Sequence, residues 1–207
     1  MQGKPEIIPM LLLEGRTILF KEYSKKALSA LSKDLRRRNF EKLYVMDVDG
    51  VERNKPQLDV IQALADDFSI SYEAGPRRGA NVVDLVIAGA DMAYMSTLSL
   101  ASLGEVEVAL AFSENVGFKV DWNGGVQGHG KMIEGASLSE VVKGAIHYGA
   151  KDIVVPVEII KEAAGLLQGS DAVLRAIADR PGDEKAMDPR IKSLIVSLEL
   201  LPDEVVK

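Results

Sequence analysis

Short apolar runs alternate with amphipathic stretches along the whole chain. Runs such as EIIPMLLL and KLYVMDV contain few polar residues, which is typical of strands buried on both faces of a parallel sheet. The stretches between them repeat apolar residues at intervals of three and four, which is the spacing of a helix with one buried face. This pattern predicts seven strands, at residues 6–13, 42–48, 68–74, 91–97, 106–113, 152–157 and 192–198.

The stretches between these strands predict the helices. Helices are expected at residues 24–38, 80–88, 137–148 and 171–180, another begins at Pro56, and helical turns are expected at 98–103 and from Leu201 onward. Segment 116–121 is interpreted as a hairpin partner or a strand extension. Strands and helices that alternate with short connections form either a closed barrel or an open doubly wound sheet, and periodicity does not separate the two. No linker divides the chain, so residues 1–207 are expected to form a single domain.

Composition and charge remove several classes of function. The 207 residues carry 25 Lys and Arg against 31 Asp and Glu, so a net charge of −6 provides no basic field for nucleic acid or an anionic membrane. The absence of cysteine excludes disulfides, thiolate metal sites and cysteine nucleophiles, and two histidines do not suffice for a histidine-rich metal centre. The N-terminal apolar run is too short to span a bilayer. A cytoplasmic protein without a metal or cofactor is therefore expected.

Short motifs in the chain, taken in order, resemble one enzyme family. They are IIP at 7–9 with Gly15-Arg16, DVDG at 47–50, EAGPRR at 73–78, and AGAD at 88–91 leading to Ser96-Thr97, with a looser similarity in GLLQG at 165–169 and the helix expected after it. The series resembles the phosphoribosylformimino-aminoimidazole-carboxamide ribotide isomerases of histidine biosynthesis and their synthase relatives. The resemblance implies a TIM-type (β/α) barrel, and the chain is expected to encode about seven of its strands, with Lys207 reached before an eighth.

The resemblance also implies where the reaction would take place. The family uses two carboxylates on opposite sides of the barrel mouth, one on strand one and one on strand five, as general acid and general base. Alignment of the motifs places these positions on Leu12 and Ser113. Leucine cannot transfer a proton, and serine does so poorly without a partner base. The catalytic acid pair of the family is therefore expected to be lost.

Other residues at the predicted strand ends are candidates for the site. Asp47 ends its strand and is either a proton-transfer group at the active end of the barrel or a cap for the following loop. Gly75 and Arg78 form either an anion site, with the guanidinium on phosphate oxygens, or a surface turn. Ser96 and Thr97 either offer hydroxyl and N–H groups to a ligand or cap the next helix.

The glycine-rich loop at residues 123–130 adds two further candidates. His129 is either a mobile acid–base group or simply solvated. Trp122, which precedes the loop, is either a lid over a substrate or an anchor in an interface. Both alternatives stay open for each residue.

These observations favour a divergent relative that binds a small phosphorylated metabolite without the acid pair of the family. The alternatives are an active sugar-phosphate or ribotide isomerase that uses other residues, and a non-catalytic barrel that binds a partner protein. A barrel of seven strands leaves an open edge between strands one and seven. We expect this gap to be covered by the C-terminal segment, by segment 116–121, or by a second copy in a homo-oligomer. Nucleic acid and membrane are not expected as partners.

Overall fold

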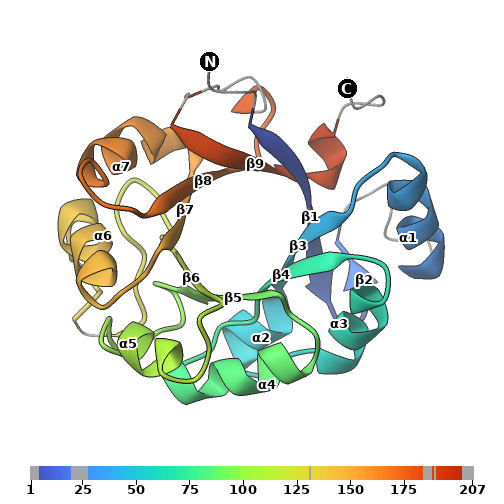
Figure 1. Cartoon of the computed structure of the whole chain (residues 1–207), viewed down its shortest axis with the longest axis horizontal. Coiled ribbons are helices and arrows are strands. Elements are labelled where there is room, and N and C mark those ends of the chain that lie inside the picture. The colour runs from blue at the N-terminus through green and yellow to red at the C-terminus, as the bar shows by residue number, and fades with distance from the viewer. Residues whose placement is uncertain (1–4, 20–27, 131, 184–187, 189, 202–207) are drawn as a thin grey trace.

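Eight parallel strands form a closed barrel (Figure 1). The computed structural model describes residues 5–19, 28–130, 132–183, 188 and 190–201. The barrel strands are β1 (Glu6–Glu14), β3 (Lys42–Asp47), β4 (Ser69–Glu73), β5 (Met92–Ser96), β6 (Val116–Lys119), β7 (Asp152–Pro156), β8 (Val173–Ala178) and β9 (Ile191–Ser197). The barrel closes where β1 pairs with β9, from Glu6 opposite Ser193 to Met10 opposite Ser197. A two-residue strand, β2 (Thr17–Ile18), lies antiparallel to β1.

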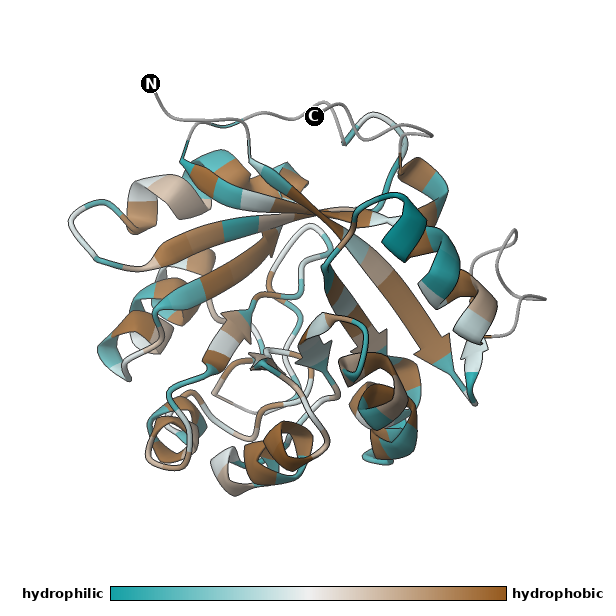
Figure 2. Cartoon of the chain, turned by 45° about the vertical axis from the view of Figure 1, so that its right-hand side comes forward, coloured by the Kyte–Doolittle hydropathy of each residue, from teal (hydrophilic) through white to brown (hydrophobic). Residues whose placement is uncertain are grey.

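Helices surround the barrel and cover the outer faces of its strands (Figure 1). They are α1 (Leu28–Arg37), α2 (Val48–Arg53), α3 (Leu58–Ala65), α4 (Val82–Ile87), α5 (Glu105–Leu110), α6 (Leu138–His147) and α7 (Ile160–Leu166), with 3₁₀ turns η1 (Gly79–Asn81), η2 (Val157–Ile159) and η4 (Leu198–Leu200). The apolar sides of α1, α3, α4, α5, α6 and α7 belong to the same core as the apolar strand residues. Figure 2 shows hydrophobic residues as brown segments along the ribbon. Helix α6 begins with a capping box, in which Ser137 and Glu140 satisfy each other's backbone N–H groups.

Several predicted elements are confirmed, including the strands that became β1, β3, β4, β5, β7 and β9. The expected cap of the first long helix, Ser24, lies outside the described residues, and so does the turn expected after Leu201. The expected turn at 98–103 contains turns and bends rather than a helix.

Three predicted elements were wrong, and together they change the count of strands. Residues 106–113 were expected to be a strand and instead contain α5, whereas 116–121 contain the barrel strand β6. The expected helix at 171–180 is the strand β8, which pairs with β7 on one side and β9 on the other. GLLQG at 165–169 therefore spans the end of α7 and precedes a strand, not a helix.

The corrected count removes the expected gap in the barrel. Strand β9, predicted as the seventh strand, is the eighth, and it pairs directly with β1. No open edge between strands one and seven remains for segment 116–121 or a second copy to cover. The closed barrel therefore gives no reason to expect a homo-oligomer that covers a gap.

The barrel interior is filled by an apolar layer between two polar groups. The apolar layer contains Ile8, Met10, Tyr44, Tyr94, Val154, Ile177 and Ile195. On one side of it, Asp152 and Arg175 form an ion pair near the start of their strands. On the other side, at the C-terminal ends of the strands, lie the ionisable groups that are described next.

Candidate functional site

The C-terminal mouth of the barrel contains a buried lysine between two carboxylates. The Lys119 Nζ lies 2.8 Å from Glu73 Oε1 and 2.8 Å from Asp121 Oδ1. The side chain of Lys119 is 7% exposed, that of Glu73 is 0% and that of Asp121 is 8%. Because the active sites of TIM-type barrels lie at this end, the three residues form the strongest candidate site.

Strand alternation explains why these side chains meet. In β6 and the residues after it, Phe118 and Val120 belong to the outer apolar core, so Lys119 and Asp121 face the interior. In β4, Tyr72 belongs to the outer core, and its neighbour Glu73 faces inward. The two strands are separated by β5, and the long side chain of Lys119 reaches across it.

The charges of the group are coupled. Burial raises the pKa of Glu73, and the charge of Lys119 together with a hydrogen bond from Tyr44 only partly offsets this effect. Burial alone would lower the pKa of Lys119, but the charges of Asp121 and Glu73 outweigh it and raise that pKa above its ordinary value. Lys119 is therefore held as an ammonium in the free protein.

Asp121 is fixed by contacts from the end of β5. Its Oδ2 accepts hydrogen bonds from the Thr97 hydroxyl, at 3.2 Å, and from the Leu98 backbone N–H, at 3.1 Å. The Asp121 N–H in turn donates to the Thr97 hydroxyl oxygen, at 2.9 Å. Thr97, a predicted ligand binder, thus orients a carboxylate of the mouth.

Asp47, the predicted proton-transfer residue, faces away from the interior. It is fully buried and shares the outward phase of Val45. Its carboxylate accepts hydrogen bonds from the N–H of Gly50, at 3.0 Å, the N–H of Gln57, at 2.6 Å, and the hydroxyl of Tyr72, at 2.5 Å. These contacts make it the N-cap of α2 and favour the capping alternative over proton transfer.

The other predicted anion binders are not gathered into one site. A Cβ at Gly75, where φ is +63°, would lie 2.5 Å from the Val51 Cα, so this glycine allows β4 and α2 to pack closely. Arg78 is exposed and precedes η1. Ser96 is buried at the end of β5, with its hydroxyl 3.2 Å from that of Ser99. Of the predicted anion binders, only Arg78 could bring a positive charge to a ligand at the rim.

Of the two positions that the family resemblance assigned to catalysis, Leu12 lies on a barrel strand and Ser113 does not. Leu12 pairs with Met46 and shares the inward phase of Ile8 and Met10, so the strand-one position is apolar, as expected. Ser113 is not on a barrel strand; it follows α5, and its backbone N–H donates to the carbonyl of Ala109. The placement of the strand-five position on Ser113 was wrong because the fifth barrel strand is β6, whose mouth side carries Lys119 and Asp121.

The glycine-rich loop lies beside the mouth. The His129 N–H donates to the Thr97 carbonyl, whereas the residue itself is exposed. The Trp122 indole N–H donates to Glu158, at 3.0 Å, and Glu158 also pairs with Arg180, so contacts link the loops that follow β6, β7 and β8. Neither His129 nor Trp122 contacts Asp121 through a described side-chain hydrogen bond.

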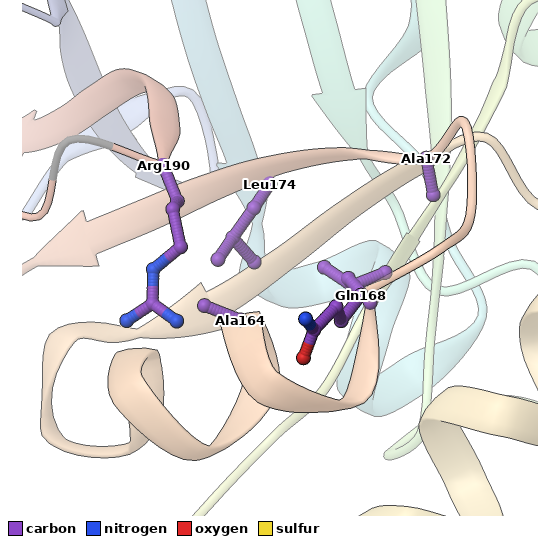
Figure 3. Close-up of a pocket in the computed structure, with 6 residues that line it drawn as sticks. Ala164, Gln168, Ala172, Leu174 and Arg190 are labelled. Carbon is purple, nitrogen blue, oxygen red and sulfur yellow. The ribbon is translucent and has the colours of Figure 1, made fainter.

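A cavity of about 380 Å³ lies outside the barrel, against α7 and β8 (Figure 3). It is lined by Ala164, Leu167, Gln168, Ala172, Leu174 and Arg190. Arg190 is paired with Asp188 by two hydrogen bonds, which largely neutralises the charge at its edge. None of the residues that line this cavity belongs to the ionisable group in the mouth, so the two are separate. Among the described residues, no cluster of His, Asp and Glu could hold a metal ion, and no helix has the length and apolar composition to cross a membrane.

The comparisons with known proteins agree with the barrel. The model of the family described as "Histidine biosynthesis protein" matches residues 12–181. The chain belongs to this family. A search of curated proteins finds no match. Membership in the histidine biosynthesis family covers the strands from the end of β1 to β8, and therefore includes Glu73, Lys119 and Asp121.

Proposed function

We propose that this member of the histidine biosynthesis family is an enzyme that binds a small phosphorylated carbonyl metabolite at the barrel mouth and transfers a proton through Asp121. The observation that carries the proposal is the carboxylate at the mouth of the fifth strand, held in place by Thr97 and Leu98. The family resemblance implies a general acid or base on this strand. Asp121 supplies the group that the alignment to Ser113 had missed.

Lys119 supports proton abstraction next to a carbonyl group. When a carbon beside a carbonyl loses a proton, negative charge develops on the carbonyl oxygen. The Lys119 ammonium lies 2.8 Å from Asp121, so a cation stands beside the base to offset that charge. Glu73 and Asp121 use two of the three N–H groups of Lys119, which leaves one donor for a substrate oxygen.

The apolar strand-one position limits the reaction to one side of the mouth. Leu12 offers no acid or base opposite Asp121. An isomerisation that needs a carboxylate on each face is therefore not supported, whereas one carboxylate that removes a proton and returns it to a neighbouring atom is compatible with aldose–ketose isomerisation.

The phosphate of such a metabolite would bind at the rim. Two carboxylates in the mouth repel an anion, and the Thr97 hydroxyl is already bonded to one of them. Arg78, exposed after β4, is the candidate for this contact, because a guanidinium pairs well with phosphate oxygens. Gly75 and Ser96 would then support the loop and not the ligand.

The test is exchange of substrate hydrogen with solvent deuterium. Small phosphorylated aldoses and ketoses are incubated with the protein in heavy water, and loss of the C–H signal next to the carbonyl is followed by NMR. Asp121→Asn should reduce the exchange rate by about 10²- to 10⁴-fold. Asp179→Asn, a matched change at an exposed aspartate after β8, should leave the rate unchanged. Equal rates in wild type and Asp121→Asn would contradict the assignment of Asp121.

A binding barrel without catalysis is the second candidate, and Leu12 is the observation that favours it. A thermal-shift screen with the same compounds separates the two, because a ligand at roughly a hundred times its dissociation constant stabilises a protein by about 2.7 kcal/mol. Stabilisation without deuterium exchange would support the binding barrel. Absence of both would argue against a phosphorylated carbonyl ligand.

A further inference from the structure

Lys119 differs from the other lysines that the structure describes, since it alone is buried. Two carboxylates contact its Nζ at the same distance, 2.8 Å. They come from different strands and are held separately: Tyr44 donates to Glu73 at 2.9 Å, and Thr97 and Leu98 donate to Asp121. The Lys119 amine therefore has two fixed carboxyl groups beside it, and either one can exchange a proton with it.

We infer that Lys119 is a nucleophile that forms an imine with the carbonyl carbon of the substrate. The inference rests on the proposed function, because it names the covalent form in which a carbonyl metabolite would be held at the same mouth. Lysine amines form such Schiff bases with carbonyl compounds in enzymes. An iminium nitrogen would then take up the electrons that are released when Asp121 removes a proton from the adjacent carbon.

The balance of the reaction assigns a task to each carboxyl group. Asp121 takes one proton from the Lys119 ammonium, and the free amine adds to the carbonyl carbon, so an N–C bond forms. Glu73 passes a second proton from the nitrogen to the carbonyl oxygen, which becomes a hydroxyl. The hydroxyl then leaves as water when the C–O bond breaks. Overall the ammonium and the carbonyl compound give an iminium and one water molecule, and no oxidant or reductant is needed. Asp121 delivers the proton it took to the leaving hydroxyl, and it is then again a carboxylate that can remove a proton from the adjacent carbon.

The charges around Lys119 predict how imine formation depends on pH. The flanking carboxylates raise the pKa of the amine above its ordinary value, so the free protein holds it as the ammonium. Addition therefore requires the transfer of a proton to Asp121, and a higher pH should accelerate it. The groups that face Lys119 are Glu73 from β4 and Asp121 from the end of β6, with Tyr44 from β3 behind Glu73.

The experiment is reductive trapping of the folded, full-length protein. The protein is incubated with formaldehyde, glycolaldehyde phosphate or dihydroxyacetone phosphate and sodium cyanoborohydride, and the modified lysines are identified by peptide mass spectrometry. We expect an adduct on Lys119 despite its burial, with a yield that rises with pH. Lys119→Arg keeps the charge between the two carboxylates but removes the nucleophile, and it should lose this adduct. Lys151→Arg, at an exposed lysine, should keep it.

Formaldehyde makes the test independent of the true substrate, because the smallest carbonyl compound needs no fitted pocket. If exposed lysines are modified while Lys119 stays unmodified until urea unfolds the chain, the inference is overturned and Lys119 is only an ion-pair partner. If deuterium exchange through Asp121 proceeds in that case, the proposed function survives with Lys119 as a noncovalent cation. If the adduct forms but Asp121→Asn exchanges at the wild-type rate, the imine survives and the role given to Asp121 fails.

Discussion

The buried carboxylates of this barrel are held by different partners, and the partners indicate their roles. Asp47 accepts two backbone N–H groups and a tyrosine hydroxyl, which is the environment of a cap. One carboxylate oxygen of Asp121 accepts a hydrogen bond from the Leu98 N–H, just after β5, and the other contacts the buried Lys119 ammonium at the mouth. Both residues end or follow a strand, so their position in the sequence is equivalent and only the face they occupy separates them.

Asp47 should therefore be important for stability and not for the chemistry of the mouth. Asp47→Ala leaves the N–H groups of Gly50 and Gln57 and the hydroxyl of Tyr72 without their acceptor. The loss of unfolding free energy should be about 2–4 kcal/mol, measured by urea denaturation. Asp66→Asn, at an exposed residue, should change it by less than about 0.5 kcal/mol. A stable Asp47→Ala protein that has lost deuterium exchange would restore Asp47 as a proton-transfer candidate.

Glu73 should make the stability of the protein depend on pH. Its pKa in the folded protein is raised above the ordinary value of 4.5, mainly by burial, so the folded state binds its proton more tightly than the unfolded state. The resulting stabilisation is fully present below pH 4.5 and is lost as pH rises through the folded pKa. Relative to Glu73→Gln, which cannot ionise, the wild type should lose stability as pH rises above 4.5.

Urea unfolding of both proteins at several pH values measures this difference. Glu107→Gln, on the exposed side of α5, serves as the control and should run parallel to the wild type. A constant difference between wild type and Glu73→Gln across the range would mean that Glu73 keeps the same charge in the folded and unfolded states.

At the scale of elements, the errors in the sequence-based prediction have a common cause. Segment 106–113 contains an apolar run of strand length, but Val106 and Ala109 are buried at helical spacing while Val108 is exposed. Segment 171–180 is rich in residues that favour helices, yet its pairing with β7 and β9 makes it a strand. Short segments of this kind are decided by neighbours that are distant in sequence, which local patterns do not contain.

The candidate site was missed for a related reason, although a signal was present. Segment 116–121 alternates apolar Val116, Phe118 and Val120 with Gly117, Lys119 and Asp121, which is the period of a strand with two different faces. With 106–113 predicted as the fifth strand, 116–121 is expected only as a hairpin partner or a strand extension. The phase that Asp47 shares with Val45 does not show its face from the sequence, because both faces of this strand are apolar. The meeting of Glu73 with Lys119 across β5 requires the closed barrel and could not be predicted from spacing.

Two glycines of the glycine-rich loop, Gly128 and Gly130, pack so closely that a Cβ would overlap a neighbour. A Cβ at Gly130 would overlap the carbonyl group of Ala101, whereas a Cβ at Gly125 would meet no atom within 4 Å. Gly130→Ala should therefore reduce the unfolding free energy by about 1–3 kcal/mol, and Gly125→Ala should change it by less than about 0.5 kcal/mol. Urea denaturation of the two variants gives the comparison. Equal stabilities would mean that the loop moves away from Ala101 without cost.

Across the whole molecule, the barrel interior carries ionisable groups at both ends. The mouth contains the Glu73, Lys119 and Asp121 group, and the N-terminal end contains Asp152 and Arg175, with the apolar layer between them. The interiors of such barrels are usually dominated by branched apolar side chains. The two polar groups therefore have separate consequences: the mouth group lies at the end of the barrel where we propose that a ligand binds, whereas the opposite pair joins strands.

The Asp152–Arg175 pair joins neighbouring barrel strands, and its loss should lower the free energy of unfolding. Arg175 on β8 donates to Asp152 on β7 at 2.8 Å and to the Ser193 hydroxyl on β9 at 2.8 Å, and Tyr94 on β5 donates to Asp152 at 2.8 Å. Asp152→Asn leaves a buried guanidinium without its countercharge, and Arg175→Met leaves a buried carboxylate. Each change should cost about 3–5 kcal/mol, because removal of one partner of a buried pair strands the other charge.

The double variant separates the energy of the ion pair from the energy of the packing around it. Asp152→Asn with Arg175→Met leaves no buried charge, and the asparagine carbonyl can still accept the Tyr94 hydroxyl, so its cost should be well below the sum of the single variants. Urea denaturation of all four proteins gives the coupling energy. The exposed pair of Lys151 and Asp171, 3.8 Å apart, is the matched control, and its coupling should be at most about 0.5 kcal/mol. Additive effects of Asp152→Asn and Arg175→Met would show that the two residues stabilise their strands independently.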